Sequence, residues 1–532
     1  MEQKMNSENS KVVRAAGIVG ALTMVSRVFG LARDMVIAAF FGASWMTDAF
    51  WVAFRIPTTL SRLLGEGSLT ASFIPVFTEY LHKKTKEEAL ELAYNAFTFL
   101  SIILTIVTTL GIIFSPFIIS VIGYGFTSDP RQFALAVFLN RLMFPYIFII
   151  SMGALFMGIL NSFRRFTSPA LSPVIWNIAI IAAALGLRSF FAEPITALAI
   201  GVLIGGVLQL ALQWPFLRKC GVRLQFRFNI RHPGLKQIGL LLIPAMLGAG
   251  ITTINIFVSS TLASLLPRGS VTYLFYADRI MELPLGVFAI AIGTAILPSF
   301  SRHAAAGNID ELKSSISFAL RIMLFLTIPS TFALMVLNTP IISVLFQRGA
   351  FDAQAAICTG QALFFYGMGL WAFSVVRVFV QSFYALQDSK WPMRAAMISF
   401  VVNLLFSLAL MYPMKHKGLA LANSLSAVAN VFILSLVLKG KIGQFLDRSF
   451  YTSVFKIVLS SVIMVASIML IDYFLPWHID AAFKTKAIYL ISTITAGGAV
   501  FLLSAYGLKS QEIHSIVNIL KEKLSRSSNG LS

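Results

Sequence analysis

Residues 92–122 read LAYNAFTFLSIILTIVTTLGIIFSPFIISVI, a long apolar segment without a charged side chain. A helix needs about 20 apolar residues to cross the hydrocarbon core of a bilayer, which is roughly 30 Å thick. Comparable segments recur along the 532 residues of the chain. The chain is 57% hydrophobic and only 12% charged, whereas soluble domains carry about 25% charged residues. The sequence therefore predicts an all-α, polytopic membrane protein.

Fourteen segments are predicted to span the membrane, and this even number places both termini on the same side. Lys and Arg are retained in cytoplasmic loops, and most of them lie in the segments on the side of the termini, including residues 218–236. Both termini are therefore predicted to be cytoplasmic. Retention of Lys and Arg in these loops explains the net charge of +20. The charge therefore does not indicate a nucleic acid as a partner. The predicted spans are 12–41, 46–80, 92–122, 133–161, 170–189, 194–217, 237–265, 270–300, 315–346, 354–386, 393–413, 418–438, 452–475 and 486–507.

The two halves of the chain resemble each other at an offset near 223 residues. Pro116-Phe-Ile-Ile-Ser-Val returns as Pro340-Ile-Ile-Ser-Val, and Arg55-Ile56 returns as Arg279-Ile280. Each repeat has six spans, so both repeats have the same orientation, an arrangement typical of transporters whose substrate site lies between two lobes. The predicted domains are residues 1–220 (N-lobe, spans 1–6), 221–440 (C-lobe, spans 7–12), 441–507 (two additional spans) and 508–532 (an amphipathic cytoplasmic tail).

Seven arginines lie well inside the predicted spans. A charge at bilayer depth is unfavourable unless it faces a partner, a water-filled cavity or an anionic ligand. The planar guanidinium group binds phosphate in a bidentate manner, so the sequence predicts an internal anion site. For Arg141 and Arg377, snorkelling towards the membrane interface explains the position equally well. The seven are Arg27, Arg33, Arg55, Arg62, Arg141, Arg279 and Arg377.

Acidic residues accompany several of these arginines. Arg27 and Asp34 are seven residues apart and share a helical face, while Arg33 points partly aside. Arg279 can reach Glu282 one turn further on. Two interpretations stay open, namely ion pairs that hold spans together and a cavity whose acids moderate its positive charge. The acidic candidates are Asp34, Asp48, Glu66, Asp278 and Glu282.

The sequence lacks the motifs of enzymatic chemistry. It contains no His-Glu-x-x-His and no phosphate loop ending in Gly-Lys-Ser/Thr, and its six histidines lie in loops, at predicted span ends or in the tail. Cys220 and Cys358 are too few for a disulfide framework or a cysteine metal site. We therefore predict no enzymatic activity, no metal and no cofactor. A polytopic membrane enzyme acting on lipid-linked sugars is the alternative from another class.

Several motifs resemble those of the MurJ-type lipid II flippases, which belong to the multidrug/oligosaccharidyl-lipid/polysaccharide exporter superfamily. The resemblance covers roughly residues 12–510 and includes the layout of fourteen spans. The first-span and eighth-span motifs are the most specific. The motifs are Ser26-Arg-Val-Phe-Gly-Leu-Ala-Arg-Asp34, Thr47-Asp-Ala-Phe-Trp-Val-Ala-Phe-Arg-Ile-Pro57, Glu66-Gly67, Phe73-Ile-Pro-Val-Phe and Tyr276-Ala-Asp-Arg-Ile-Met-Glu-Leu-Pro284.

The resemblance implies a flippase in the bacterial cytoplasmic membrane. It would move lipid II, the undecaprenyl-pyrophosphate-linked peptidoglycan precursor, from the inner to the outer leaflet by alternating access, with cavity arginines binding the pyrophosphate. Residues 441–507 would form a groove for the lipid tail. Coupling to sodium or to the membrane potential is implied without an ion site that can be placed, and the implied partners are lipid II, membrane lipids and cell-wall synthesis proteins.

The residues of the family's motifs can be placed on this chain. The family often shows an arginine pair before its Glu-Gly, where this chain has Ser61-Arg62, so Arg62 would act alone. The alternatives within the superfamily are a flippase for another polyprenyl-linked oligosaccharide and a multidrug antiporter, although an antiporter of cations calls for a net acidic cavity. The substrate-binding candidates are Arg27, Arg33, Asp34, Asp48, Arg62 and Arg279, and the secondary cavity candidates are Arg55, Glu66, Asp278 and Glu282.

Overall fold

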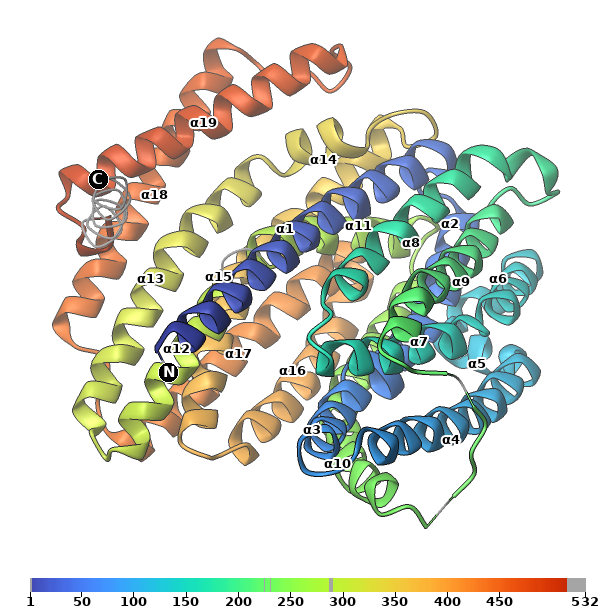
Figure 1. The fold of residues 1–532 in the computed structure, drawn as a ribbon. Helices are drawn as coiled ribbons and strands as arrows, with labels where there is room; N and C mark the ends of the chain where they lie inside the picture. The colour runs from blue at the N-terminus through green and yellow to red at the C-terminus, as the bar shows by residue number, and fades with distance from the viewer. Residues whose placement is uncertain (1, 224, 230, 287–289, 514–532) are drawn as a thin grey trace. The chain divides into compact units, whose positions relative to one another are not determined.

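The computed structural model describes residues 2–223, 225–229, 231–286 and 290–513, and this part of the chain is helical apart from its turns and loops (Figure 1). Among these residues the only β pairing is an isolated bridge between Arg348 and Phe351. The described residues also include short non-α helices, among them the π-helix η1 (Arg62–Glu66) and the 3₁₀ helices η2 (Tyr124–Ser128) and η3 (Arg188–Phe190).

The α-helices are, in chain order, α1 (Glu2–Phe41), α2 (Trp45–Ser61), α3 (Ser68–Lys83), α4 (Lys86–Ile113), α5 (Ser115–Ile122), α6 (Pro130–Met143), α7 (Tyr146–Ser162), α8 (Thr167–Gly186), α9 (Thr196–Lys219), α10 (Pro233–Ser264), α11 (Ser270–Pro284), α12 (Ile290–Ala305), α13 (Ile309–Val336), α14 (Asn338–Phe346), α15 (Ala353–Ala385), α16 (Lys390–Met414), α17 (His416–Ile442), α18 (Arg448–Phe474) and α19 (Phe483–Gly507).

Each of the fourteen predicted spans coincides with one long helix or with two consecutive helices. Within the described residues, ten segments are long and apolar enough to cross a membrane, which confirms a polytopic helical protein. The first, second, seventh and eighth predicted spans are not among these ten. The second and eighth are divided into helices shorter than 18 residues. The number of fourteen crossings stays a prediction.

Prolines divide several of the predicted spans. Pro116 occupies the first turn of α5, directly after α4 ends, and Pro145 lies between α6 and α7. Proline lacks the backbone N–H that would continue a helix, but it is accepted in a first turn, where that N–H has no intrahelical partner. The predicted spans 92–122 and 133–161 are therefore pairs of helices.

The chain forms two compact units, residues 1–272 with 348–351 and residues 273–347 with 352–532. In the first unit α1 packs along α8, and α8 packs along α9 (Figure 1). Glycine makes the second contact close, because a Cβ on Gly201 would lie 2.7 Å from Ala183 Cβ and one on Gly205 would lie 2.7 Å from Trp176 Cδ1. Small residues that allow the backbones of neighbouring helices to approach are typical of membrane helices.

The predicted repeat is visible in the helix boundaries of the two units. The helices α4 and α13 both have 28 residues and begin at an offset near 223 residues. Their contacts correspond as well, since α4 packs on α7 as α13 packs on α15, and α8 packs on α9 as α16 packs on α17. The internal repeat therefore recurs at the level of helix length and helix packing.

One helix departs from this correspondence. The repeat relates α10 to α1, and α1 packs on α8, whereas α10 packs on α2, α3, α4 and α5 of the first unit. The first compact unit therefore continues to residue 272, beyond the boundary at 220 that the repeat predicts. A compact unit and a sequence repeat need not end at the same residue. The boundary at residue 220 therefore stays a prediction about the repeat.

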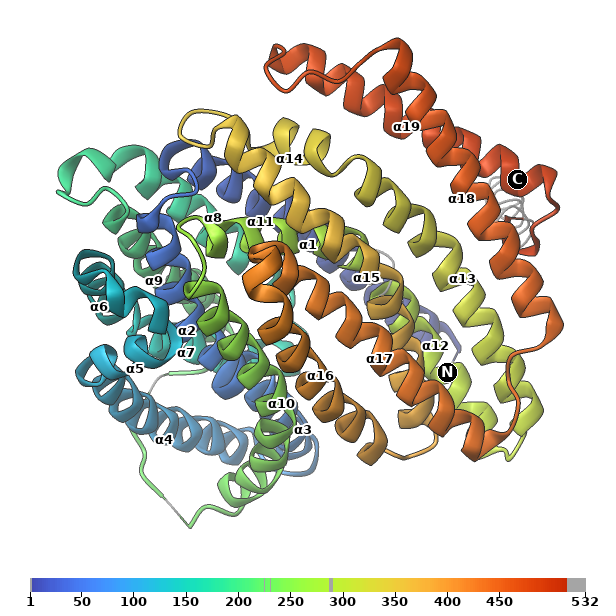
Figure 2. The same ribbon diagram turned by 180° about the vertical axis from the view of Figure 1, so that it is seen from behind.

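In the second unit, α18 packs on α13 and α19, and α19 also packs on α14 (Figure 2). Lys486 of α19 is buried, and its Nζ donates to Ser343 Oγ at 3.2 Å, Gln347 Oε1 at 2.9 Å and Ile479 O at 2.7 Å. These contacts tie the additional helices to α14. Residues 514–532, which hold most of the predicted amphipathic tail, lie outside the described residues.

Candidate functional site

The first group of candidate residues lies on α1 and α8. Arg33 and Asp34 are only 3% and 1% exposed. The Arg33 guanidinium donates to Asp34 Oδ1 from Nε at 2.9 Å and from Nη2 at 2.6 Å, and from Nη1 to Asn177 Oδ1 at 3.1 Å. It also lies 5.1 Å from the ring centre of Trp176. The charge of Arg33 is therefore paired with that of its neighbour, and Arg33 helps to join α1 to α8.

Arg27 differs from Arg33 in its surroundings. It is half-buried on α1, and within the described residues no ion pair or hydrogen bond engages its guanidinium. Helical spacing predicts that Asp34 shares a face with Arg27, but in the structure Asp34 forms an ion pair with Arg33. Among the described residues, the positive charge of Arg27 therefore has no ion-pair partner.

Two further arginines lie on α2 and η1. Half-buried Arg55 donates from Nη1 to Ser260 Oγ of α10 at 3.0 Å, so it links two helices of the first unit. Arg62 is exposed and begins the π-helix η1, and single π turns are frequently found at functional sites. The side chain of Glu66 lies outside the described part of the structure.

Asp48 is a buried acceptor of hydrogen bonds. Its carboxylate is 2% exposed and accepts hydrogen bonds from the backbone N–H of Gly269 at 2.6 Å, the backbone N–H of Thr272 at 2.9 Å and Thr272 Oγ1 at 2.7 Å. These donors belong to the first turn of α11 and the loop before it, where a helix has unpaired N–H groups. Asp48 therefore caps α11 in this structure, and its contact with substrate stays a prediction.

The turn between α1 and α2 makes a second close contact beside this cap. The backbone N–H of Ala350 donates to Ala39 O at 2.8 Å. Gly42 and Gly349 both have positive φ values, and a Cβ on them would lie 2.3 Å from Ala350 O and 2.2 Å from Ala39 O, respectively. Only glycine fits such a backbone-to-backbone approach. We call these interactions, together with those of Asp48, the closing contacts: Ala39, Gly42, Asp48, Gly269, Thr272, Gly349 and Ala350.

An exposed ion pair accompanies the closing contacts. Arg268 Nη2 lies 2.6 Å from Asp129 Oδ2. The pKa of Asp129 is lowered from its ordinary value, first by the backbone N–H of Gln132 and then by the Arg268 side chain. At neutral pH Asp129 is therefore negatively charged and available to Arg268.

The candidate residues of the second unit lie on α11 and α15. Arg279 Nη1 lies 3.2 Å from Glu282 Oε2, which confirms the predicted pairing one turn apart, and both side chains are largely accessible. The guanidinium carbon of Arg279 lies 5.8 Å from the ring centre of Phe275. Asp278 and Arg377 are half-buried. The side chains of Arg279 and Glu282 are 39% and 52% exposed, so this pair is far more accessible than the buried pair of Arg33 and Asp34.

The candidates thus divide between the two units. Arg27, Arg33, Arg55 and Arg62 belong to the first unit, as does Arg141, which is exposed at the end of α6. Arg279 belongs to the second unit, so its convergence with Arg27 and Arg33 on one cavity stays a prediction. Across the described residues, no three His, Cys, Asp or Glu side chains are grouped closely enough to hold a metal ion.

The second unit also contains an apolar groove between α13, α15 and α18, with a volume of about 470 Å³. The resemblance implies a lipid-tail groove in residues 441–507, and here α18 contributes one wall while α13 and α15 contribute the others. A cavity of this lining suits a hydrocarbon chain. It is lined by Leu324, Ile328, Thr331, Phe332, Met335, Met368, Trp371, Phe450, Val454 and Val458.

Comparisons with known proteins agree with the fold and with the motifs. The model of the family described as lipid II flippase MurJ matches residues 37–488. A probable lipid II flippase MurJ of Buchnera aphidicola is 34% identical over 485 residues, which cover 91% of this chain and 95% of the relative.

Two solved structures extend the comparison. A lipid II flippase MurJ in an inward closed conformation is 27% identical with a TM-score of 0.75, covering 92% of this chain and 97% of that one. A multidrug resistance MATE transporter of the MOP superfamily in an inward-facing conformation is 16% identical with a TM-score of 0.67, covering 81% of this chain and 98% of that one. The second likeness shows a shared fold.

Proposed function

Because the chain belongs to the lipid II flippase MurJ family, we propose that it translocates lipid II from the cytoplasmic to the outer leaflet by alternating access. The family is one of transporters, and the ten long apolar segments make this chain a multi-pass protein of the bacterial inner membrane. Lipid II and membrane lipids are accordingly its partners. Cell-wall synthesis proteins as partners, and coupling to sodium or to the membrane potential, are further parts of the proposal.

The observation that carries the proposed mechanism is that the half-buried Arg27 has no ion-pair partner in the described part of the chain. Pyrophosphate is strongly hydrated, so its passage across hydrocarbon needs charged or polar groups to replace that water. Arg27 has no ion-pair partner among the described residues, and the pair of Arg279 and Glu282 is accessible. We assign direct pyrophosphate binding to Arg27 and Arg279. Arg33, held by Asp34 and Asn177, positions α1.

The closing contacts supply the second part of the mechanism. They consist of backbone groups, the Asp48 carboxylate and the Thr272 hydroxyl, and they join the end of α1 and the start of α2 to residues 269–272 and 348–351. On the proposed topology this end of the first unit faces the outside. Lipid II release to the outer leaflet would then require these contacts to separate, and resetting would require them to form again.

The arginine assignment is tested by complementation of a strain depleted of its own flippase, with membrane levels measured by immunoblot. Arg27→Ala should abolish growth at a normal protein level, because removal of an unpaired cation strands no buried partner. Arg27→Lys should also be impaired, because it keeps the charge but loses the bidentate geometry. Full complementation by Arg27→Ala would refute direct binding by this residue.

Arg33→Ala is the matched comparison for Arg27→Ala. It leaves the Asp34 carboxylate buried without its partner, and such a loss typically costs about 3–5 kcal/mol. The protein level of Arg33→Ala should therefore fall, whereas that of Arg27→Ala should not. Equal levels of both variants would show that the ion pair has no stabilising role.

The proposed orientation has a separate test. Single cysteines near Ser44 and Ser128 should react with a membrane-impermeant reagent applied outside, and one near Lys84 should not. The reverse pattern would contradict the cytoplasmic placement of both termini and the direction of transport.

The rival cargo, another polyprenyl-linked oligosaccharide, is distinguished by measuring the leaflet accessibility of labelled lipid II in cells depleted of this protein. Lipid II should remain in the inner leaflet if it is the cargo. A multidrug antiporter or an enzyme of lipid-linked sugars would leave its distribution unchanged.

A further inference from the structure

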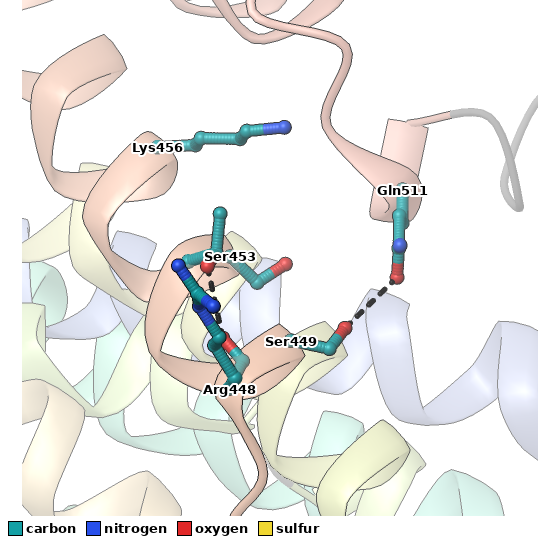
Figure 3. Close-up of a pocket in the computed structure, with 6 residues that line it drawn as sticks. Arg448, Ser449, Ser453, Lys456 and Gln511 are labelled. Carbon is teal, nitrogen blue, oxygen red and sulfur yellow. Dashed lines mark hydrogen bonds between the residues drawn. The ribbon is translucent and has the colours of Figure 1, made fainter.

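A polar cavity of about 270 Å³ lies in the second unit, where α18 begins and the chain leaves α19 (Figure 3). Two of its lining side chains are cationic, and the other four carry hydroxyl or amide groups. Every one of them can donate a hydrogen bond, and no carboxylate is among them. The lining residues are Arg448, Ser449, Thr452, Ser453, Lys456 and Gln511.

Arg321 of α13 forms hydrogen bonds with two of the lining residues. Its Nη1 donates to Ser449 Oγ at 3.0 Å and to Gln511 Oε1 at 2.7 Å. Glu512 does not line the cavity and is only 2% exposed. Its carboxylate accepts hydrogen bonds from Ser453 and Ser510, and its Oε1 lies 3.8 Å from Arg321 Nε. The segment after α19 is therefore fastened to α13 and α18, and the charge of Glu512 faces Arg321.

The two cations that line the cavity are not neutralised in the same way. Lys456 Nζ donates to Lys509 O at 3.1 Å, a neutral carbonyl. Asp447 precedes Arg448, but its carboxylate caps α18 by accepting from the Phe450 N–H at 2.9 Å. Within the described residues no carboxylate forms an ion pair with Arg448 or Lys456. Among the described residues, the cavity thus has two cationic lining residues that no carboxylate pairs with, at the start of the 27-residue helix α18.

We propose that this cavity binds the phosphate group of an anionic phospholipid. Phosphate oxygens accept hydrogen bonds, and the charged N–H groups of Arg448 and Lys456 can donate them. The hydroxyl groups of Ser449, Thr452 and Ser453 donate to Gln511 Oε1, Arg448 O and Glu512, respectively, so the two cations are the donors on which the site depends. The site is distinct from the arginines of α1 and α11 and is an accessory lipid site. It goes beyond the proposed transport function, because it would hold a membrane lipid that is not the cargo.

The surface beside the cavity favours a lipid over a soluble phosphate. Tyr451, Phe455 and Val462 follow one another along α18 and are 56%, 67% and 48% exposed. An exposed apolar stripe on a membrane helix faces acyl chains, and basic pockets at the cytoplasmic ends of membrane helices bind anionic lipid headgroups. On the proposed topology the cavity lies at the cytoplasmic end of α18, so a lipid of the inner leaflet can place its phosphate in the cavity and its chains along this stripe.

The test measures lipid binding to the purified full-length protein by native mass spectrometry, with phosphatidylglycerol as the probe and phosphatidylcholine as the zwitterionic comparison. Arg448→Gln combined with Lys456→Gln should weaken phosphatidylglycerol binding at least about tenfold, since each variant residue removes a charge-assisted hydrogen bond. The matched control removes one arginine and one lysine from the start of α16, by Lys390→Gln with Arg394→Gln, and should bind like the wild type. Unchanged binding by the cavity variant would overturn the proposal.

A second variant covers the case in which the double substitution disturbs α18. Thr452 is exposed, and its hydroxyl bonds only to Arg448 O of its own helix, at 2.9 Å. Thr452→Asp places a carboxylate in the cavity and should abolish phosphatidylglycerol binding, whereas Thr452→Ser should retain it. Displacement of the lipid by inorganic phosphate or glycerol phosphate alone would show a site for soluble phosphate and would overturn the assignment to a lipid. Because the readout is lipid binding, a failed transport proposal would not alter the result.

Discussion

Asp48→Asn tests whether the closing contacts control opening of the first unit. The carboxylate accepts three hydrogen bonds, at 2.6, 2.7 and 2.9 Å. The amide oxygen of asparagine can keep the two bonds from Thr272, but its NH₂ group then meets the N–H of Gly269. A hydrogen bond to a charged group contributes about 1.5–3 kcal/mol, so the open population should rise about tenfold to a hundredfold.

The assay uses a cysteine at position 260, in a protein whose two natural cysteines are replaced. Ser260 is fully buried on α10, so a thiol there reacts with an impermeant reagent only after the unit opens. When opening is fast, the labelling rate follows the open population. We expect Asp48→Asn to label about tenfold faster or more.

Asp129→Asn is the matched control, because Asp129 also contacts the loop before α11 but through an exposed pair with Arg268. Exposed ion pairs contribute about 1 kcal/mol or less, so its labelling should change by less than about fivefold. Equal labelling of Asp48→Asn and the unchanged protein would refute the role of the closing contacts. A strong effect of Asp129→Asn alone would assign the closure to the exposed pair.

Three further outcomes can be checked. Gly349→Ala should speed labelling at position 260, because its φ is +57° and its Cβ would lie 2.2 Å from Ala39 O. Lys486→Met should lower the thermal unfolding temperature of the purified protein, since it removes the donor of three hydrogen bonds, whereas the exposed Lys484→Met should not. Labelling should also rise slightly on acidification, but only as the pH falls below the ordinary carboxyl range. The reason is that the lowered pKa of Asp129 keeps its contact with Arg268 intact above that range. A change in labelling between pH 6 and 8 would point to another group.

The fold class could be predicted from the sequence because its cause is local. A helix in hydrocarbon satisfies its own backbone hydrogen bonds, so the apolar length of a segment such as 92–122 is sufficient evidence. The pairing of Arg279 with Glu282 could be predicted for the same reason, since residues three apart on a helix are neighbours. The repeat could be recognised from matching residues in the two halves, and the equal lengths of α4 and α13 agree with it.

The closing contacts could not be predicted, because their partners are far apart in the chain. Nothing near Asp48 in the sequence indicates that its carboxylate caps α11, more than 200 residues later. Arg33 illustrates a different limit. Helical spacing placed Asp34 on the face of Arg27, but the flexible Arg33 side chain turns to pair with the adjacent Asp34, and the choice depends on Asn177 and Trp176 of α8.

The two glycines of the closing contacts have an evolutionary consequence. Main-chain atoms form most of the closing contacts, and main-chain atoms are the same in every residue type. A substitution can therefore change the strength of these main-chain contacts only indirectly, through the shape of the turn. At Gly42 and Gly349 almost any substitution removes the close approach. Relatives that adapt to different membranes or growth temperatures would have to tune the stability of the closing contacts at their two interacting side chains, Asp48 and Thr272, or in the exposed residues around them.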